Sequence, residues 1–494
     1  MGKRQKAFLR LGGHVTACGA VWAAAVALIG LGGSAGASSV TSVGLDSPYL
    51  ADRALAVDMN GRLRIENIRM AGTEASIALE LERFEVFTPD AKIVVYGADG
   101  KSLLPVPKTA FFKGSAAGAP DSLALIVVRE SGEVSGFLDR DGRFVMIGQE
   151  RSNQGAIRAA LARELDAASV FGERAANWKC GNQEHDLTVA LSEVLGTAPQ
   201  VPLTSTIYTL DLGVVSDFEF FSLAPFGGSV AAVRDYIATL VASTSAIYER
   251  DFLTRVRLQY LEIYSTAADP FVQTNTNCAL REFGNYWHDN HNAEDVALVH
   301  FVSGKAAGGG IAWIGVVCNA GFAAVGPACT PPVPPYSWGG KYAVSMDLDG
   351  DWNPMTGTVV WDIYVFSHET GHNVGSPHTH CYADYPTAGD PAIDECYGGE
   401  CGGSGCWCGA NSLPTNGGGS IMSYCHLLSG GYSNIHLYMG RAGFYGNMSE
   451  RVNTRVRTHI EAHGNCLNRA MVCTGPGTGA SGAGASKVQT YQKQ

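Results

Sequence analysis

Three histidines and one glutamate are spaced so that they could bind and use a single metal ion. They occur in the stretch His368-Glu369-Thr370-Gly371-His372-Asn373-Val374-Gly375-Ser376-Pro377-His378. His368 and His372 are four residues apart, so on a helix they lie on the same face, one turn apart. Glu369 stands next to the first of these ligands and can reach a metal-bound water without being a ligand itself.

The third histidine reaches the same ion only if the chain turns sharply after the helix. Gly375 stands at that place, and glycine adopts a positive φ without strain. His378 then follows as the third ligand. Three neutral imidazoles suit one Zn²⁺ ion and leave its fourth position open, which is the catalytic rather than the structural arrangement. The alternative is a helix with two solvated histidines and a C-terminal glycine.

A second motif begins 42 residues after His378 and reads Ser420-Ile421-Met422-Ser423-Tyr424. Metzincin proteases carry the extended zinc motif followed by a Met-containing turn beneath the metal, and this chain resembles that clan. Residues 246–251 and 309–318 most resemble the reprolysin (adamalysin) family, over the region from roughly residue 200 to roughly residue 470. The resemblance implies that Met422 packs beneath the imidazoles and is not itself a ligand.

Two positions depart from the reprolysin pattern. Thr379 follows His378, where reprolysins usually carry Asp. The turn reads S-x-M-x-Y, which resembles the turn of astacins and serralysins. In those families the tyrosine binds zinc or stabilises the oxyanion, so the resemblance makes Tyr424 a candidate catalytic residue.

The motifs predict a zinc endopeptidase with protein or peptide substrates. Zn²⁺ on the three histidines would activate a water, and Glu369 would act as the general base. By resemblance, the strand at 311–317 is the sheet edge beside the cleft, where a peptide could pair by strand addition. Two alternatives are a zinc-containing adhesion or binding protein without catalysis and a zinc hydrolase with a non-peptide substrate. Since every residue of the constellation is present, the endopeptidase is preferred.

The first 37 residues are predicted to be a secretory signal peptide. Four basic residues precede an apolar run at 17–31, and Ala35-Gly36-Ala37 offers a cleavage site. We therefore expect a secreted protein cleaved after Ala37. Loss of the four positive charges would take the net charge from −11 to −15. That charge argues against nucleic acids and anionic membranes as partners. The oligomeric state is left open.

Thirteen cysteines are present, and twelve remain once Cys18 leaves with the signal peptide. In an exported protein an even number indicates disulfides. Six of the cysteines fall between His378 and the residue after Tyr424. A structural zinc site around 406–408 is the alternative to disulfides there.

The fold is predicted to be α+β, with a β-rich region before a metzincin-like catalytic domain. Residues 38–199 form the β-rich region, residues 200–473 show alternating strands and helices, and residues 474–494 read as a disordered tail. The position of 38–199 resembles that of a reprolysin propeptide. The alternative is an accessory domain that the mature protein keeps.

Cys180 bears on that choice because it is followed by glycine shortly before the predicted catalytic domain, as in a cysteine switch. A thiolate would fill the open zinc position and exclude water. The alternative is an ordinary disulfide, and if Cys180 is a switch then Cys473 is a candidate for the odd cysteine.

Two further candidate ligand sets are weaker. The acidic turn 347–353 looks like a calcium loop, but an EF-hand needs Glu where Thr358 stands, so calcium is unsupported and a solvated turn is preferred. His380 could compete with His378 for the metal, but its spacing does not fit the motif.

Overall fold

The computed structural model describes residues 40–45, 47, 49–70, 75–140, 143–151, 157–164, 178–180, 206–319, 321, 323–324, 329–330, 332, 337–352, 359–402, 405–473 and 487–490. The predicted signal peptide, the residues between Cys180 and Thr206 and most of the predicted C-terminal tail lie outside them.

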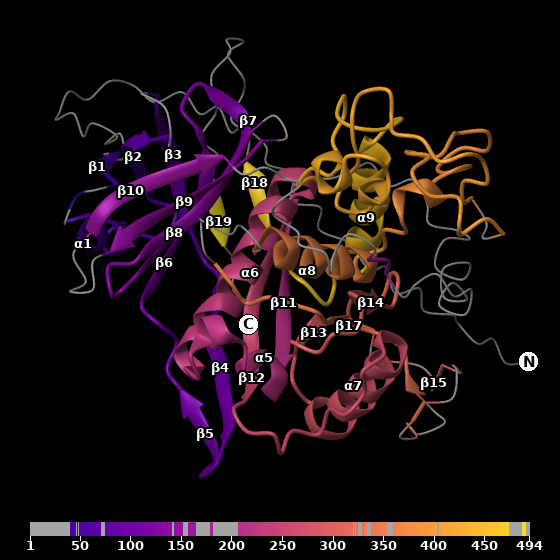
Figure 1. Cartoon of the computed structure of the whole chain (residues 1–494), viewed down its shortest axis with the longest axis horizontal. Helices are drawn as coiled ribbons and strands as arrows, with labels where there is room; N and C mark the ends of the chain where they lie inside the picture. Colours follow the sequence, from indigo (N-terminus) through magenta and orange to yellow (C-terminus); the bar gives the residue numbers. More distant parts are fainter. Residues whose placement is uncertain are drawn as a thin grey trace, which may run out of the picture. The chain divides into compact units, whose positions relative to one another are not determined.

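The N-terminal region forms an eight-stranded sheet, drawn from indigo to purple in Figure 1. Its strands follow in space as β1 (Thr41–Gly44), β2 (Arg62–Arg69), β3 (Ser76–Phe84), β6 (Thr109–Ala116), β7 (Ala119–Arg129), β8 (Val134–Arg140), β9 (Arg143–Arg151) and β10 (Ile157–Glu164). Apolar residues alternate along β2, where Leu63 and Ile65 are fully buried. They pack with α1 (Leu50–Leu55) in a separate small core. The expected β-rich region is confirmed.

The second sheet is mixed and positions the predicted site. It runs in the order β14 (Gly310–Ala312), β17 (Tyr342–Ser345), β13 (Leu298–Val302), β11 (Thr206–Ser216), β12 (Thr254–Tyr264), β4 (Phe87–Gly97) and β5 (Gly100–Leu104). Its central strands β12, β11 and β13 are parallel to one another, while β14 is antiparallel to β17. Off this path, β18 (Asn468–Cys473) pairs with β11 and with β19 (Lys487–Thr490). A separate pair joins β15 (Ala323–Ala324) to β16 (Ser337–Trp338).

The two sheets are not independent, because β4 and β5 leave the N-terminal region and extend the second sheet. Ile93 of β4 lies opposite Leu261 of β12 in a parallel pair, and β5 pairs with the other edge of β4, as Figure 1 shows. One hydrophobic core contains side chains from both regions, including Phe111, Phe137 and Ile247. Residues 40–494 form one compact unit, so the predicted boundary near residue 200 does not divide the structure into two.

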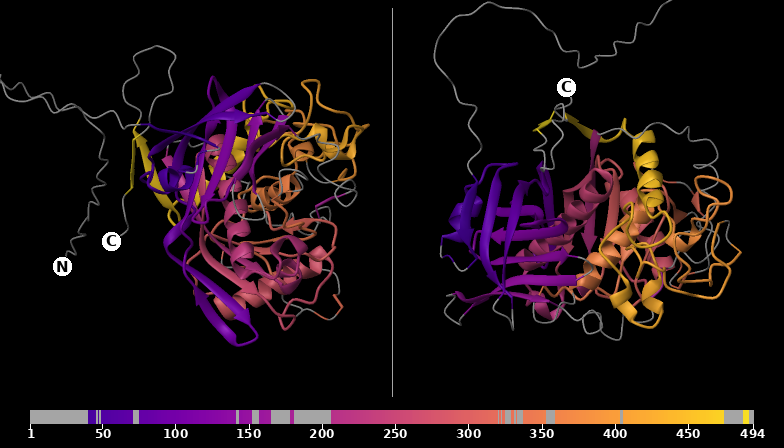
Figure 2. Two further views of the ribbon diagram at one scale, coloured as in Figure 1. Left: turned by 60° about the vertical axis from the view of Figure 1, so that its left-hand side comes forward. Right: turned by 90° about the horizontal axis from the view of Figure 1, so that it is seen from above.

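Helix α6 (Val230–Phe252) lies inside this shared core. It is long and apolar enough to cross a membrane, yet 72% of its most apolar window is buried inside the fold. It contacts β7 of the first sheet, β12 of the second and helix α8 (Val359–Asn373). Figure 2 shows the indigo and purple strands of the first sheet next to the magenta part of the chain that contains α6. A helix enclosed on all sides is expected to be apolar all round.

The remaining helices are short or lie on the periphery of the second sheet. They are α5 (Phe218–Phe221), α7 (Thr276–His291) and α9 (Glu450–Ala462), with the 3₁₀ turns η3 (Ala224–Phe226), η4 (Thr379–Cys381), η5 (Cys425–Leu427) and η6 (Gly431–Asn434). Together with the strands of the second sheet, they bear out the alternation of strands and helices predicted within residues 200–473.

Two predictions of strand content were wrong in detail. The strand expected at 311–317 ends at Ala312, although β14 does lie at the sheet edge. Beyond it the chain leaves the sheet, because the N–H groups of Gly315 and Val316 donate to carbonyls at the end of α8. In the tail expected to lack structure, β19 pairs with the open edge of β18.

Candidate metal centre

Helix α8 holds the first two histidines, and the core helix α6 holds α8. The Tyr248 hydroxyl donates to the Ser367 carbonyl at 2.6 Å, and the Thr244 and Ser367 hydroxyls are hydrogen-bonded at 2.8 Å. Ser367 precedes His368 directly. The backbone that carries the first ligand is therefore fixed by buried hydrogen bonds rather than by solvent-exposed contacts.

The imidazoles of His368 and His372 are oriented by carbonyl groups. Nδ1 of His368 donates to the Ile421 carbonyl and Nδ1 of His372 to the Ser376 carbonyl, both at 2.7 Å. These bonds place the proton on Nδ1 and leave the lone pair on Nε2, the usual outer support of a metal-binding histidine. The two Nε2 atoms face one another at 3.1 Å.

The third histidine arrives through the expected turn. Gly375 has φ +105°, and its N–H donates to the carbonyl of His372. Nδ1 of His378 is hydrogen-bonded to Oε2 of Glu400 at 3.1 Å. Nε2 of His378 is buried and has no hydrogen-bond partner among the described residues.

These residues fit a zinc ion. Burial lowers the pKa of His368 and of His372 well below the ordinary value, so both rings are neutral, as metal binding requires. Two facing lone pairs and an orphaned Nε2 in a buried site are stabilised by a cation between them. Three imidazoles would be the ligands, and a fourth position would stay open to another donor.

Glu369 lies beside the imidazoles, in a space that the absence of a side chain at Gly310 leaves open. Burial raises its pKa well above the ordinary carboxyl value, and its Oε1 has no hydrogen-bond partner among the described residues. Gly310 of the edge strand β14 faces it, since a Cβ at this position would meet Oε1 at 2.5 Å. A carboxylate so placed can accept a proton from a water bound between the imidazoles and the sheet edge.

The turn at 420–424 supports the site from below. A Cβ on Gly371 of α8 would meet Sδ of Met422 at 2.6 Å, so Met422 packs directly against the helix between the first two histidines. The Met422 carbonyl accepts hydrogen bonds from the N–H and the hydroxyl of Thr379, at 2.9 and 3.1 Å. Thr379, the departure from the usual Asp, thereby ties the residue after His378 to this turn.

The open side of the imidazole cluster is filled by the segment 178–180. Sγ of Cys180 lies 3.6 Å from Nε2 of His372 and 3.4 Å from Oε2 of Glu369. Ligand atoms of Cys180, His368, His372 and His378 all lie within 4.8 Å of one another. A cavity of about 910 Å³ lies elsewhere, around Asp211 and Arg257.

Tyr424 contacts this segment. Its hydroxyl accepts from the Cys180 N–H at 2.8 Å and donates to the Cys180 carbonyl at 3.3 Å. The Tyr424 ring packs over His378 with ring centroids 4.4 Å apart. The hydroxyl thus bonds a backbone N–H and a backbone carbonyl, which any peptide bound in this place would also have.

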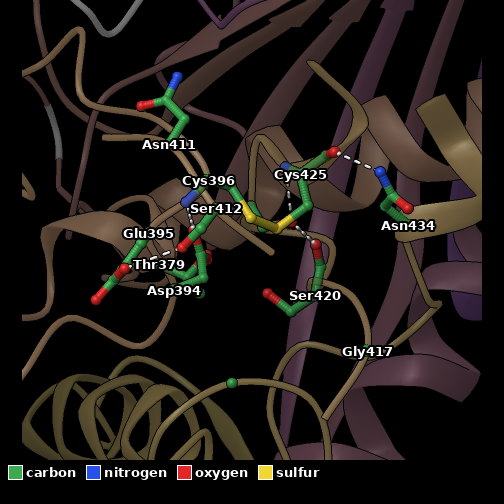
Figure 3. Close-up of a disulfide and its surroundings, with 12 residues drawn as sticks. Thr379, Asp394, Glu395, Cys396, Asn411, Ser412, Gly417, Ser420, Cys425 and Asn434 are labelled. Carbon is green, nitrogen blue, oxygen red and sulfur yellow. Dashed lines mark hydrogen bonds between the residues drawn. A yellow bond between two sulfur atoms is a disulfide. The ribbon is translucent and has the colours of Figure 1, made fainter. Parts of the chain in front are cut away.

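Disulfides build the loop that follows His378. Three of them lie there, Cys381–Cys406, Cys396–Cys425 and Cys401–Cys408, and Figure 3 shows the second, with Thr379 and Asp394 near one cysteine and Ser420 near the other. The alternative of a structural zinc at 406–408 is therefore wrong. With Cys278–Cys329 and Cys318–Cys466, the five disulfides among the described residues use ten cysteines and leave Cys180 a thiol. The alternative of a disulfide at Cys180 is also wrong.

The acidic turn has a structural partner. The N–H groups of Asp349 and Gly350 donate to the Asp362 carboxylate at 3.0 and 2.9 Å. Burial raises the pKa of Asp362 to about 7. The Asp362 carboxylate thus holds this turn against the first part of α8, and the carboxylates of the turn do not gather as a metal-ligand cluster among the described residues.

Comparison with known proteins identifies the region that contains this site. A model of metallopeptidase family M12, named Reprolysin_5, matches residues 208–435. Residues 208–435 are therefore similar to the metallopeptidases of family M12. The reprolysin-like resemblance is thus confirmed, and this family uses zinc. No curated protein matches the chain. Among solved structures it is similar to metalloproteinase-II from Bacteroides fragilis, at 12% identity and a TM-score of 0.33, covering 69% of this chain and 89% of that one.

Three residues near the M12 site were not predicted from the sequence. Glu400 supports His378, Trp178 fills a pocket beside His368, and His426 bonds the Trp178 carbonyl at 2.9 Å. The position of Trp178, two residues before the candidate switch ligand Cys180, was the one sequence feature that could have pointed to it. Glu400 and His426 have no recognisable spacing, because loops and disulfides bring them to the site.

Proposed function

We propose that this protein is a secreted zinc endopeptidase that its own residues 178–180 hold in a latent form. The observation that carries the proposal is the convergence of three imidazole nitrogens beside the buried carboxylate of Glu369. The match of residues 208–435 to metallopeptidase family M12 supports a zinc-dependent peptidase. Endopeptidase activity and secretion are the steps that we add.

Zinc held by His368, His372 and His378 would activate a water and polarise the scissile carbonyl. Glu369 accepts the proton of the attacking water and delivers it to the leaving amine. A raised pKa makes this carboxylate a stronger base, which favours the first transfer, the uptake of a proton from water. Gly310 leaves the space in which this exchange takes place.

Tyr424 supplies a hydrogen-bond donor for the developing oxyanion. In the latent form its hydroxyl is bonded to the backbone of Cys180, and departure of that segment frees it for a substrate. A donor placed beside the reacting carbonyl in a site without bulk water stabilises the transition state more than the ground state. The edge strand β14 offers backbone groups for an extended peptide.

Cys180 accounts for latency. Its sulfur stands among the imidazoles, where a thiolate would occupy the fourth position and exclude water. Residues 38–199 then act as a propeptide-like region, and activation requires that Cys180 leave the site. The five disulfides suit an oxidising compartment, which supports secretion after cleavage near Ala37.

The test compares Glu369→Gln with its parent in a Cys180→Ala full-length chain. We expect unchanged zinc content and a loss of casein hydrolysis of about 10²- to 10⁴-fold, the usual contribution of a general base. Glu395→Gln is the matched control and should stay active, because the Glu395 carboxylate accepts a hydrogen bond from the Ser412 hydroxyl. Zinc-containing parent protein that hydrolyses no peptide would favour the non-catalytic binding protein instead.

A further inference from the structure

Trp178 occupies a closed aromatic pocket beside the metal position. Only 2% of its surface is exposed. The indole makes edge-to-face contacts with Trp361, Tyr364, His368 and Tyr424, with ring centroids 5.0 to 5.9 Å apart. Aromatic pairs prefer this geometry, because the positive ring edge meets the negative ring face.

The walls of the pocket belong to the permanent framework of the site. Trp361, Tyr364 and His368 stand at positions i, i+3 and i+7 of α8, on one face of the helix. The Trp361 indole N–H donates to the Asp347 carbonyl at 3.1 Å, and the Tyr364 hydroxyl donates to the Ser423 carbonyl at 2.8 Å. These bonds do not involve Trp178, so the walls keep their places when Trp178 leaves.

A glycine closes the remaining side. A Cβ on Gly309 would lie 1.1 Å from Nε1 of Trp178, and Gly309 has φ +120°, which other residues rarely adopt. The side chain that fills the pocket therefore packs directly against the backbone of Gly309. A pocket with bulky aromatic walls and one glycine side accepts a flat ring better than a branched chain.

The pocket recognises ring area rather than a polar atom. Nε1 of Trp178 is buried and has no hydrogen-bond partner among the described residues. The polar contact is made by the backbone, because Nε2 of His426 donates to the Trp178 carbonyl at 2.9 Å. Burial lowers the pKa of His426 to about 4, so this ring is neutral, and it is stacked on Tyr432. Any residue in this place would offer the same carbonyl.

We propose that this pocket, vacated when residues 178–180 withdraw, binds a large aromatic side chain of the substrate, tryptophan or phenylalanine, next to the scissile bond. The inference rests on the proposed endopeptidase function and adds its side-chain preference. Residues 178–180 then mimic a substrate in two ways, with Trp178 in the side-chain pocket and the Cys180 backbone on Tyr424. Contact between Trp178 and His368 places the pocket at the metal itself.

The first test uses the full chain with Trp178→Ala and Cys180→Ala, which empties both the pocket and the metal position. Peptides that differ at a single position by Trp, Phe, Leu, Ala or Asp are offered, and the cleaved bond is identified by mass spectrometry. We expect kcat/KM for Trp and Phe to exceed that for Ala and Asp by at least about tenfold, with Leu between them. Equal rates for all five peptides would overturn the proposal.

A binding measurement separates this inference from the proteolytic one. The same chain with Glu369→Gln added is titrated calorimetrically with a peptide of residues 175–182 that carries serine for Cys180. Replacing Trp178 of the peptide by Ala should weaken binding at least about tenfold, and by Phe less than about threefold. Lys179→Ala in the peptide is the matched control, since Lys179 contacts Tyr397 outside the pocket, and should change binding less than about threefold.

The two outcomes can be told apart. If no peptide is cleaved but Trp178 still governs binding, the endopeptidase assignment fails and the pocket remains an aromatic binding site. If peptides are cleaved and the Ala peptide binds as well as the Trp peptide, the aromatic preference is wrong and proteolysis stands. Zinc content and the unfolding midpoint of each variant establish that it is folded.

Discussion

Glu400 holds the third histidine of the metal centre, with a carboxylate oxygen 2.9 Å from Nδ1 of His378. The same carboxylate is bonded to Nε2 of His380 at 3.0 Å, so one side chain is bonded to both histidines. Two disulfides flank Glu400, one through Cys401 and one through Cys381, whose sulfur lies 3.2 Å from the carboxylate. The disulfides of this cysteine-rich loop thus position the Glu400 side chain beside His378.

Glu400→Ala is expected to weaken zinc binding by about 10- to 100-fold, because an unsupported imidazole loses its orientation and its basicity. Glu400→Gln, which keeps one acceptor oxygen, should lose less. The measurement is competition with a chromophoric chelator on the full-length Cys180→Ala chain. Glu395→Gln is the control in the same loop, and an unchanged affinity for Glu400→Ala would show that His378 needs no such support.

Cys180→Ala is expected to raise the peptidase activity of the intact chain by at least about tenfold, since a strong donor then no longer fills the fourth position. Integrity of the chain during the assay is followed by mass spectrometry. Lys179→Ala, which leaves the thiol in place, should remain latent. An intact Cys180→Ala chain as inactive as the wild type would mean that the thiol is not what blocks the site.

Gly371→Ala is expected to destabilise the protein although alanine favours helix. The added methyl group would collide with Met422 and Met439, at 2.6 and 2.7 Å, and such overpacking costs about 1–3 kcal/mol. The gain in helix propensity offsets at most about 1 kcal/mol. Urea unfolding measures the difference. Adding Met422→Ala should restore part of the loss, and a purely additive double mutant would argue against the contact.

Acid is expected to weaken the contact between the first sheet and α6. Burial alone would raise the pKa of Glu249, but Lys113 and Arg255 outweigh it and lower the pKa to about 2. A lowered folded-state pKa stabilises the protein at neutral pH, and this contribution is lost as pH falls from about 4.5 to about 2. It amounts to about 3 kcal/mol at most.

Urea unfolding at pH 7 and pH 3 tests this linkage. Glu249→Gln should be less stable than the wild type at pH 7 and should lose less stability on acidification. Glu130→Gln is the control, since Glu130 forms only an exposed ion pair with Lys108. If the wild type and Glu249→Gln lose equal stability between the two pH values, other carboxylates govern acid unfolding.

The metal ligands could be read from the sequence because they depend on local geometry. The spacing of His368 and His372 follows from the helix period, and Gly375 marks where the helix must end. The aromatic pocket could not be read this way, since Trp178 and His368 are 190 positions apart in sequence and meet by tertiary packing. Glu400 depends on disulfide pairing, which cysteine spacing does not determine.

The strands themselves were largely predictable, but their partners were not. The apolar run Ile93-Val94-Val95 indicates that β4 is a strand and says nothing of which sheet it joins. Its parallel pairing with β12 depends on contacts with residues more than 160 positions away in sequence, as the pairing of Ile93 with Leu261 illustrates. The same limit explains why β17 was missed, since four buried residues without alternation carry little periodic signal.

The pairing of β4 with β12 also bears on how the latent protein matures. A protease that cut the chain once between Cys180 and Thr206 would not release the upstream piece, because backbone hydrogen bonds and a common core would still join both fragments. The expected product is a two-chain molecule that migrates as one species under native conditions and as two under denaturing ones. Maturation would then be a local withdrawal of a short blocking peptide from a scaffold that otherwise persists.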